Sequence, residues 1–298
     1  MSIRNNLHTD DGLATYAQGM CNSSGDKDRI NHCLGPGTIL ELGCGNGAYL
    51  QTIPDARLAR TTAVDMNALL LLKAQANLGE RAKLVTFKRA NMLRDDFLEL
   101  FAGQNTFGNI VLCSVLHELY SEVRTEALAE FKDERVAQTT AKKAMIGLFD
   151  DIWDLLSPGG LLVIRDGCKA PGTKVTLRFK NAEVRAAFAK FVDDHPWFIT
   201  YTEHDGGIIL NLQDAYEFLT KYFYTQNWDI EVLERFGWCN QDDILDMLQS
   251  SKHSNKRLSV IKSESYLIPW LRDRWEQDFT LSQQWPDSTM LMSIQKLA

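Results

Sequence analysis

Hydrophobic residues from position 38 onward gather into short, nearly continuous runs that longer amphipathic stretches separate. The runs are rich in Val, Ile and Leu and cover residues 38–42, 62–65, 84–88, 109–114 and 161–166. Strands with helices on both faces have this composition, and their alternation with helical stretches is typical of a parallel sheet with right-handed crossovers. The pattern therefore predicts a doubly wound α/β fold around a mostly parallel sheet.

Between the fourth and fifth runs, residues 122–156 carry one long helical pattern that is rich in Ala, Glu and Lys. Ser157-Pro158-Gly159-Gly160 follows it and is expected to supply a helix stop and a turn before the fifth strand. The alternation ends after the fifth run. Residues 167–239 contain a basic extended piece, a helix over about 181–193 and an aromatic stretch at 213–228, and we expect them to form a helical cap inserted into the fold.

The last part of the chain is expected to complete the sheet. Asn240 suits the N-cap of a helix with acidic residues in its first turn, which the helix dipole favours. Two apolar runs, 258–267 and 289–297, would close a seven-stranded sheet as a hairpin-like pair, with the segment 270–285 over one edge. The predicted organisation is an N-terminal helical segment (1–35), a ligand-binding core (36–166), the cap (167–239) and the completion of the sheet (240–298).

The composition is that of an ordinary soluble protein with a large core, since 45% of the 298 residues are hydrophobic and 24% are charged. The net charge of −7 disfavours a protein that mainly coats the phosphate backbone of a nucleic acid. No stretch approaches the roughly 20 apolar residues of a membrane-spanning helix, so no membrane role is expected.

Cysteine usage and the N-terminal residues bear on localisation. The six cysteines never form a C-x-x-C pair, and Cys44 and Cys113 fall in apolar, strand-like settings where a reduced thiol packs as a small hydrophobic group. The polar N-terminus lacks the apolar stretch of a secretory signal. We therefore expect a cytoplasmic protein with free thiols.

The first hydrophobic run leads directly into three glycines at alternate positions, Gly43, Gly45 and Gly47. Glycine permits positive φ and lets a ligand approach the backbone, so a strand-to-helix turn of this kind often lies beneath a nucleotide-like group. The spacing is G-x-G-x-G, not the G-x-G-x-x-G of dinucleotide enzymes, and no Lys-Ser or Lys-Thr follows as in a phosphate loop. We expect a ligand without a pyrophosphate.

Glu41 and Leu42, followed by the three glycines, resemble the first motif of the class I S-adenosylmethionine-dependent methyltransferases, whose fold is Rossmann-like. The turn sequence before the fifth strand also resembles the family's, and the resemblance covers about residues 36–166. It implies S-adenosylmethionine as cofactor and a hydrogen bond from its ribose hydroxyls to Asp65, at the end of the second run.

Two further contacts are implied by the same resemblance. Asn91 and Met92 end the third run, where the family contacts adenine; the family more often has Asp at the position of Asn91, but an amide can also accept from and donate to the base. The segment Tyr16–Met20 resembles a lid that some members fold over the cofactor, with a packing role for Tyr16 as the alternative. The implied cofactor-binding residues are Tyr16, Glu41, Gly43, Gly45, Gly47, Asp65, Met66, Asn91, Met92 and Ser114.

His117 and Glu118 follow the fourth run, and the family places the reacting methyl group near the end of this strand. They are the candidate catalytic residues, because an imidazole with an ordinary pKa near 6.5 can remove a proton from a hydroxyl or an amine. The alternative is that His117 hydrogen-bonds a carbonyl or helps to seat the cofactor. Glu118 would orient His117 or cap the next helix.

Arg165 and Arg178 are the candidate substrate-binding residues. They belong to a segment, 165–190, with seven basic and two acidic residues. A guanidinium group matches a carboxylate or phosphate in bidentate fashion, so the segment could recognise an anionic acceptor. The alternative is a solvated face that balances the acidic residues of 193–246.

Together these features predict a methyltransferase that acts by in-line displacement on a small-molecule acceptor, at oxygen ahead of nitrogen, with a cap that excludes water. Methylation of RNA or protein is one alternative, and a non-catalytic cofactor-binding partner subunit is another. A nicotinamide dehydrogenase is disfavoured by the glycine spacing. No cluster of ligand residues indicates a metal site. The acceptor, the atom methylated and a homodimeric state are left open.

Overall fold

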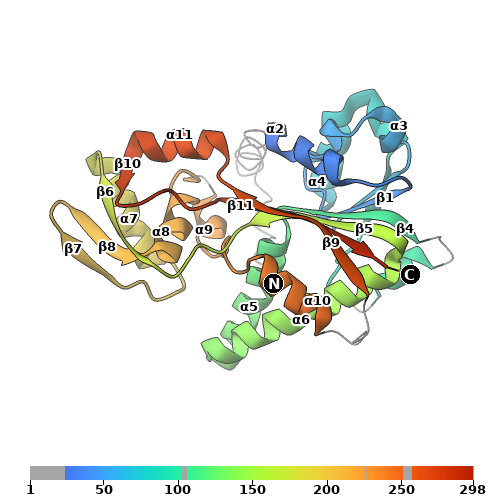
Figure 1. Ribbon diagram of the computed structural model, residues 1–298. Coiled ribbons are helices and arrows are strands. Elements are labelled where there is room, and N and C mark those ends of the chain that lie inside the picture. Colours follow the sequence, from blue (N-terminus) through green and yellow to red (C-terminus); the bar gives the residue numbers. More distant parts are fainter. Residues whose placement is uncertain (1–23, 95, 103–105, 226, 251–256, 298) are drawn as a thin grey trace. The chain divides into compact units, whose positions relative to one another are not determined.

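The computed structural model describes residues 24–94, 96–102, 106–225, 227–250 and 257–297 (Figure 1). The chain divides into two compact units, and each is described by itself. The core unit consists of Ser23–Asp166, Gln241–Glu264 and Leu291–Ala298. In the described part of the chain, the second unit consists of Gly167–Asn240 and Ser265–Met290.

The core unit is built on the predicted seven-stranded sheet, with strand order β3-β2-β1-β4-β5-β11-β9. Its strands are β1 (Ile39–Leu42), β2 (Thr61–Asp65), β3 (Thr86–Arg89), β4 (Phe107–Cys113), β5 (Leu156–Gly167), β9 (Leu258–Tyr266) and β11 (Thr289–Lys296). The pairs among β1 to β5 are all parallel, as predicted. The order reverses at β1, which pairs with β2 on one side and β4 on the other.

The two C-terminal strands form the expected pair. Leu297 N donates to Arg257 O (2.8 Å), beyond one end of β9, and Ser288 N donates to Tyr266 O (3.0 Å) at the other. This crossed pattern of donors and acceptors is that of antiparallel neighbours.

Helices cover both faces of this sheet, with α3 and α4 on one side and α5, α6 and α10 on the other (Figure 1). The α-helices are α2 (Ser24–Lys27), α3 (Asp55–Leu58), α4 (Ala68–Leu78), α5 (Leu116–Phe131), α6 (Glu134–Leu155) and α10 (Gln241–Gln249). Short 3-10 helices occur at Asp28–Cys33, Leu50–Thr52, Gly79–Leu84 and Leu98–Phe101. None of the helices in the described part of the chain has both the length and the hydrophobicity needed to cross a membrane. The described cysteines are buried and form no disulfide with one another.

The single long helix predicted over residues 122–156 is wrong, because this stretch belongs to two helices, α5 and α6. Lys132 adopts a left-handed conformation (φ 55°) and ends α5. The Asp133 side chain then caps α6 by accepting hydrogen bonds from Arg135 N and Val136 N. Buried Arg124 of α5 bonds Glu134 of α6 (2.9 Å) and holds the two helices together. A helix-capping residue directly after a residue in left-handed conformation marks the boundary between two helices. The continuous helical periodicity of the sequence hid this boundary.

The turn predicted at residues 157–160 is also wrong. β5 begins at Leu156, directly after α6, and the four residues lie within the strand. The pairing of β4 with β5 shifts there, from Phe107 opposite Leu156 to Asn109 opposite Leu161. The extra residues form a bulge, which accommodates Gly159 at positive φ (77°).

The second unit contains a four-stranded antiparallel sheet, β10-β6-β8-β7, that the sequence pattern did not reveal. Its strands are β6 (Lys174–Phe179), β7 (Tyr201–His204), β8 (Gly207–Asn211) and β10 (Phe279–Leu281). Its helices are α7 (Ala182–Asp194), α8 (Leu212–Leu219), α9 (Trp228–Glu231) and α11 (Pro269–Asp278). The helix expected over 181–193 is confirmed as α7, with Asn181 as its N-cap. Segment 270–285 belongs here rather than over the edge of the large sheet, since β10 pairs with β6.

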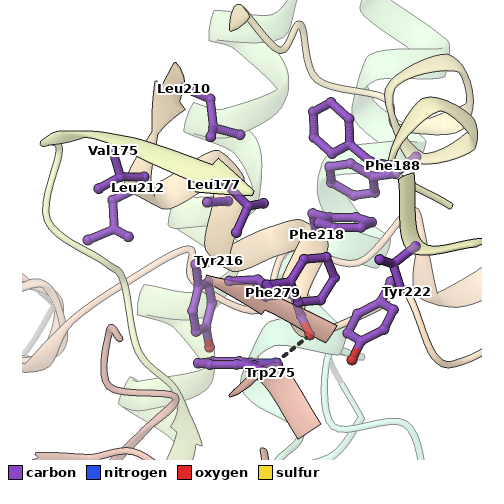
Figure 2. Close-up of a cluster of buried hydrophobic side chains, with 14 of the residues drawn as sticks. Val175, Leu177, Phe188, Leu210, Leu212, Tyr216, Phe218, Tyr222, Trp275 and Phe279 are labelled. Carbon is purple, nitrogen blue, oxygen red and sulfur yellow. Dashed lines mark hydrogen bonds between the residues drawn. The ribbon is translucent and has the colours of Figure 1, made fainter. Parts of the chain in front are cut away.

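An aromatic cluster forms the core of the second unit (Figure 2). Phe218 packs edge-to-face against Phe188 (ring centroids 5.1 Å apart) and Phe279 (5.6 Å). The indole of Trp275 is fully buried in this cluster and donates a hydrogen bond to Leu219 O (2.8 Å). Most aromatic side chains of the stretch 213–228 therefore belong to the core of this unit.

Candidate cofactor and catalytic site

The site residues predicted from the sequence gather mainly at the carboxyl ends of β1, β2, β3, β4 and β5, all within the core unit. The sheet order reverses at β1 and β4. In open α/β sheets the crevice at such a switch point, beyond the carboxyl ends of the strands, is where ligands bind.

The glycine loop after β1 is strained for any other residue. Gly43, Gly45 and Gly47 all have positive φ (74°, 52° and 77°). A Cβ on Gly43 would lie 2.4 Å from Val115 Cγ2, and one on Gly47 would lie 3.0 Å from Ala74 Cβ. The loop therefore packs tightly against the chain that follows β4 and against α4, which only glycine permits.

Asp65 ties the end of β2 to this loop. One carboxylate oxygen accepts from Gly45 N (2.8 Å) and the other from Asn67 N (2.8 Å), and the residue is buried. Asn67 in turn caps α4. Each oxygen of a carboxylate can accept more than one hydrogen bond, so these contacts are compatible with the predicted ribose contact.

Glu41 lies on β1 with only 1% of its surface exposed. Its Oε2 atom has no hydrogen-bond partner among the described residues. Burial raises the pKa of Glu41 to about 8, and the positive charge of buried Lys27 only partly offsets this. A buried acceptor without a hydrogen bond costs free energy. Glu41 is therefore a candidate to contact a donor or cationic group of a ligand.

The remaining cofactor candidates of the described chain have well-defined surroundings. Asn91 Oδ1 accepts from Leu93 N (2.9 Å) and turns the backbone after β3, and Met92 is buried. Met66 accepts a hydrogen bond from Arg89 through its carbonyl (3.0 Å). Tyr16 lies outside the described residues, and its lid role stays a prediction.

His117 stands in the first turn of α5. Its Nδ1 lies 2.5 Å from Oδ1 of Asp166, the last residue in a run of buried positions in β5. The other oxygen of Asp166 accepts from Leu116 N (2.7 Å) and His117 N (3.3 Å). The residue that orients His117 is therefore Asp166, the role that the sequence analysis offered to Glu118.

Arg165 is held by groups of the core unit itself. Its guanidinium group bonds Asp26 of α2 (Nε–Oδ2, 2.7 Å) and Ser114 Oγ (2.5 Å), and both ends of the ion pair are buried. Ser114 has positive φ (56°), which is uncommon for a residue other than glycine. The N-terminal helix α2 thus reaches the ends of β4 and β5, and Asp26 and Lys27 join the site without any signal in the sequence.

Arg178 belongs to the second unit and bonds Asp205 (Nη2–Oδ2, 3.1 Å). Other basic residues of the segment 165–190 also have acidic partners: Arg185 pairs with Glu203, and Lys190 with Asp194. This pairing is the balanced, solvated face that the sequence analysis gave as its alternative. Recognition of an anionic acceptor by Arg165 or Arg178 stays a prediction.

Asp166 was visible in the sequence but received no role. It is the next-to-last residue of β5, much as Asp65 is the last of β2, and an acidic residue at the carboxyl end of a parallel strand is the signal that pointed to Asp65. What the sequence could not supply is the partner, because 49 positions separate Asp166 from His117.

A parallel sheet with a switch point, a positive-φ glycine loop and buried carboxylates beside it defines a Rossmann-like domain that binds a nucleoside-type ligand. A family model described as a methyltransferase domain matches residues 39–134. This match agrees with the methyltransferase motifs of the sequence, over about a third of the chain.

Among the solved structures that resemble this chain at low sequence identity are two methyltransferases. The N-methyltransferase NodS from Bradyrhizobium japonicum WM9 is 13% identical over 92% of this chain and 96% of its own, with a TM-score of 0.45. The CcbJ methyltransferase from Streptomyces caelestis is 12% identical over 91% and 89%, with a TM-score of 0.47. No curated protein matches the sequence.

Proposed function

We propose that this methyltransferase acts on a small-molecule acceptor and transfers the methyl group to oxygen. The proposal is supported above all by one observation, the pairing of His117 with Asp166 at the end of β4 and β5, beside the glycine loop of the cofactor-binding core. A hydroxyl group is a poor nucleophile until its proton leaves, so a positioned imidazole is most useful for an oxygen acceptor.

The residues of the core unit fit S-adenosylmethionine. This cofactor supplies a methyl group on a positively charged sulfur, which is transferred by in-line displacement. The unmatched Oε2 of Glu41 suits the cationic amino group of the cofactor's methionine portion. Asp65 suits the ribose hydroxyls, and Asn91 and Met92 the adenine. The chain's contribution to rate is mainly alignment and exclusion of water, which can supply about 7–11 kcal/mol.

A small-molecule acceptor is favoured over RNA by the charges of the second unit. Three of the basic residues that could follow a phosphate backbone, Arg178, Arg185 and Lys190, are paired with Asp205, Glu203 and Asp194. A protein that binds RNA through such residues loses affinity steeply as salt is added. Binding of the methylated product or acceptor that is insensitive to salt supports a small molecule.

The test combines cofactor binding with turnover. Isothermal titration calorimetry should show binding of S-adenosylmethionine and S-adenosylhomocysteine, and Asp65→Ala should weaken both more than tenfold. Asp55→Ala, at an exposed acidic residue paired with Arg81, is the matched control and should bind as the wild type does. Release of S-adenosylhomocysteine with a panel of hydroxylated and amino acceptors then measures activity.

Three results would contradict the proposal in different ways. Cofactor binding without turnover on any acceptor class would favour a non-catalytic partner subunit. Turnover confined to amines would move the reaction to nitrogen. Unchanged cofactor affinity in Asp65→Ala would remove Asp65 from the site.

A further inference from the structure

Ser114 has a backbone conformation that its side chain disfavours. Its φ of 56° lies in the left-handed region, which glycine adopts readily and other residues rarely. Ser114 directly follows β4 and precedes Val115, the N-cap of α5. A residue other than glycine stays in this region only where the surrounding structure fixes it, and such residues cluster at functional sites. The groups that fix Ser114 therefore bear on the site.

Arg165 of the neighbouring strand β5 holds Ser114 in two ways. Its carbonyl oxygen accepts from Ser114 N (2.7 Å), and its Nη1 donates to Ser114 Oγ (2.5 Å). The other edge of the guanidinium group faces α2, where Nε (2.7 Å) and Nη2 (2.5 Å) both contact Oδ2 of Asp26. The side chains of Arg165 and Asp26 are 6% and 8% exposed. A planar guanidinium group that is engaged at both edges keeps one orientation.

The conformation of Ser114 determines where the chain runs beside the glycine loop. Val115 packs so closely against Gly43 that a Cβ on this glycine would lie 2.4 Å from Val115 Cγ2. The two N–H groups that follow, at the start of α5, donate to the side chain of Asp166. A change of φ at Ser114 would therefore move Val115 relative to the anchored start of α5, and the glycine loop would lose the surface against which it packs.

We propose that Arg165 is a positioning residue, which holds Ser114 at positive φ and so keeps the glycine loop in the shape that binds the cofactor. Asp26 fixes the guanidinium group for this task. The inference rests on the proposed function, because it takes S-adenosylmethionine as the ligand of the loop. Arg165 then serves the protein's own backbone and not an anionic acceptor. Serine suits position 114 because its hydroxyl oxygen accepts the hydrogen bond from Nη1.

Arg165→Lys tests the role of the two-edged contact. Lysine can still pair with the buried carboxylate of Asp26, but its single ammonium group lacks the fork that joins Asp26 to Ser114. Isothermal titration calorimetry with S-adenosylhomocysteine should give a Kd raised more than tenfold, because Ser114 relaxes toward negative φ. Urea unfolding checks that the variant is folded.

The same substitution in a Ser114→Gly background separates positioning from a merely structural role. Glycine adopts positive φ without strain, so the turn after β4 no longer depends on the guanidinium group. Arg165→Lys should then raise the Kd less than threefold relative to Ser114→Gly alone. An equal rise in both backgrounds, or no rise in the serine background, would overturn the proposal.

Asp26→Asn is a second variant that reaches the same contact from the other side. It removes the charge that fixes the guanidinium group but keeps an oxygen that can accept from it. The Kd should rise less than in Arg165→Lys, and this rise should also disappear in the Ser114→Gly background. A rise of the same size in both backgrounds would count against the proposal as above.

Arg124→Lys is the matched control, because Arg124 is also a buried arginine that joins two elements of the core unit, through Glu134. It should lower the free energy of unfolding and leave the Kd for S-adenosylhomocysteine at the wild-type value. A Kd raised as far as in Arg165→Lys would show that the loss of any buried guanidinium group weakens binding, and would overturn the proposal.

A crystal structure of Arg165→Lys without ligand reads the conformation of Ser114 directly. We expect a negative φ at Ser114 and a displacement of Val115 from Gly43, whereas a φ still near 56° would overturn the proposal. This measurement needs neither cofactor nor acceptor. If Ser114 relaxes in the variant but the wild type does not bind S-adenosylhomocysteine, the proposed function is rejected and the hold of Arg165 on the turn stands.

Discussion

Two buried glutamates, one in each unit of the molecule, are in opposite electrostatic states. Glu41 of the core unit and Glu217 of the second unit are 1% and 2% exposed. Burial raises the pKa of Glu41 to about 8. Burial also acts on Glu217, but the charge and hydrogen bond of Lys221 outweigh it, and the pKa of Glu217 is lowered.

The difference lies in how completely each carboxylate is matched. Glu217 accepts from Gln213 Nε2 (2.8 Å), Gly237 N (3.0 Å), Phe236 N (3.2 Å) and the ammonium group of Lys221. Glu41 has an oxygen with no partner among the described residues. A buried carboxylate whose hydrogen bonds are all made within the protein stabilises the fold, whereas one with an oxygen left without a partner can accept a hydrogen bond from a ligand. Equal burial therefore conceals different roles.

The largest expected effect comes from breaking the matched pair. Lys221→Met leaves Glu217 charged and without its cation in the aromatic core, which should lower the free energy of unfolding by about 3–5 kcal/mol. Urea denaturation measures this change. Lys190→Met is the control, since Lys190 pairs with Asp194 at the surface with 57% of its side chain exposed, and it should cost less than about 1 kcal/mol. Similar losses for both variants would show that burial is not what makes the pair important.

Glu41→Gln tests the unmatched carboxylate. The folded protein keeps a proton on Glu41 that the unfolded chain releases, so this contribution to stability is complete below pH 4.5 and is lost as the pH rises to about 8. The wild type should therefore lose up to about 1.4 kcal/mol per pH unit, relative to Glu41→Gln, across this window. Urea unfolding at several pH values measures the difference.

The same variant should bind S-adenosylmethionine more than tenfold more weakly, because a bound cation favours loss of the Glu41 proton and pairs with the resulting carboxylate, whereas an amide cannot ionise. Glu80→Gln, at an exposed residue paired with Lys83, should match the wild type in affinity and in pH dependence. Parallel pH curves for the wild type and Glu41→Gln would contradict the raised pKa of Glu41.

A smaller effect of opposite sign is expected from His195 in the second unit. Burial, followed by the nearby charge of Lys221, lowers its pKa from 6.5 to about 3. The unfolded chain then binds a proton that the folded protein does not, so stability is lost as the pH falls below 6.5. The slope is at most about 1.4 kcal/mol per pH unit, and the 9% exposure of His195 reduces it.

His195→Phe should remove this acid sensitivity while keeping the ring contacts with Phe191 and Trp197 (centroids 4.3 and 4.5 Å away). Unfolding curves between pH 4.5 and 7 provide the measurement. His204→Phe, at an exposed histidine of β7, is the control and should unfold with the wild-type pH dependence. If His195→Phe remains as acid-sensitive as the wild type, the pKa of His195 is not lowered.

Sequence periodicity was sufficient for the architecture of the core unit. The five hydrophobic runs correspond to β1 to β5, and the two C-terminal runs to β9 and β11, because a strand between helical layers must be apolar on both faces. It was insufficient where short polar signals interrupt a periodic pattern, as at Lys132 and Asp133 between α5 and α6. It also failed to assign residues 270–285, because the partner strand β6 lies about 100 positions earlier.

Local sequence by itself determined the glycine loop and the acidic residues beside it, because positive φ and strand ends are properties of a few consecutive residues. Only the tertiary structure decided what surrounds the polar side chains of the site. It pairs His117 with Asp166 and Arg165 with Asp26. It also leaves one carboxylate oxygen of Glu41 without a hydrogen-bond partner among the described residues. The pairs are 49 and 139 positions apart in the chain. The charge and protonation of a side chain depend on the groups that surround it in space. Folding brings these groups together from distant segments, and the local sequence of one segment does not indicate which other segment it will contact.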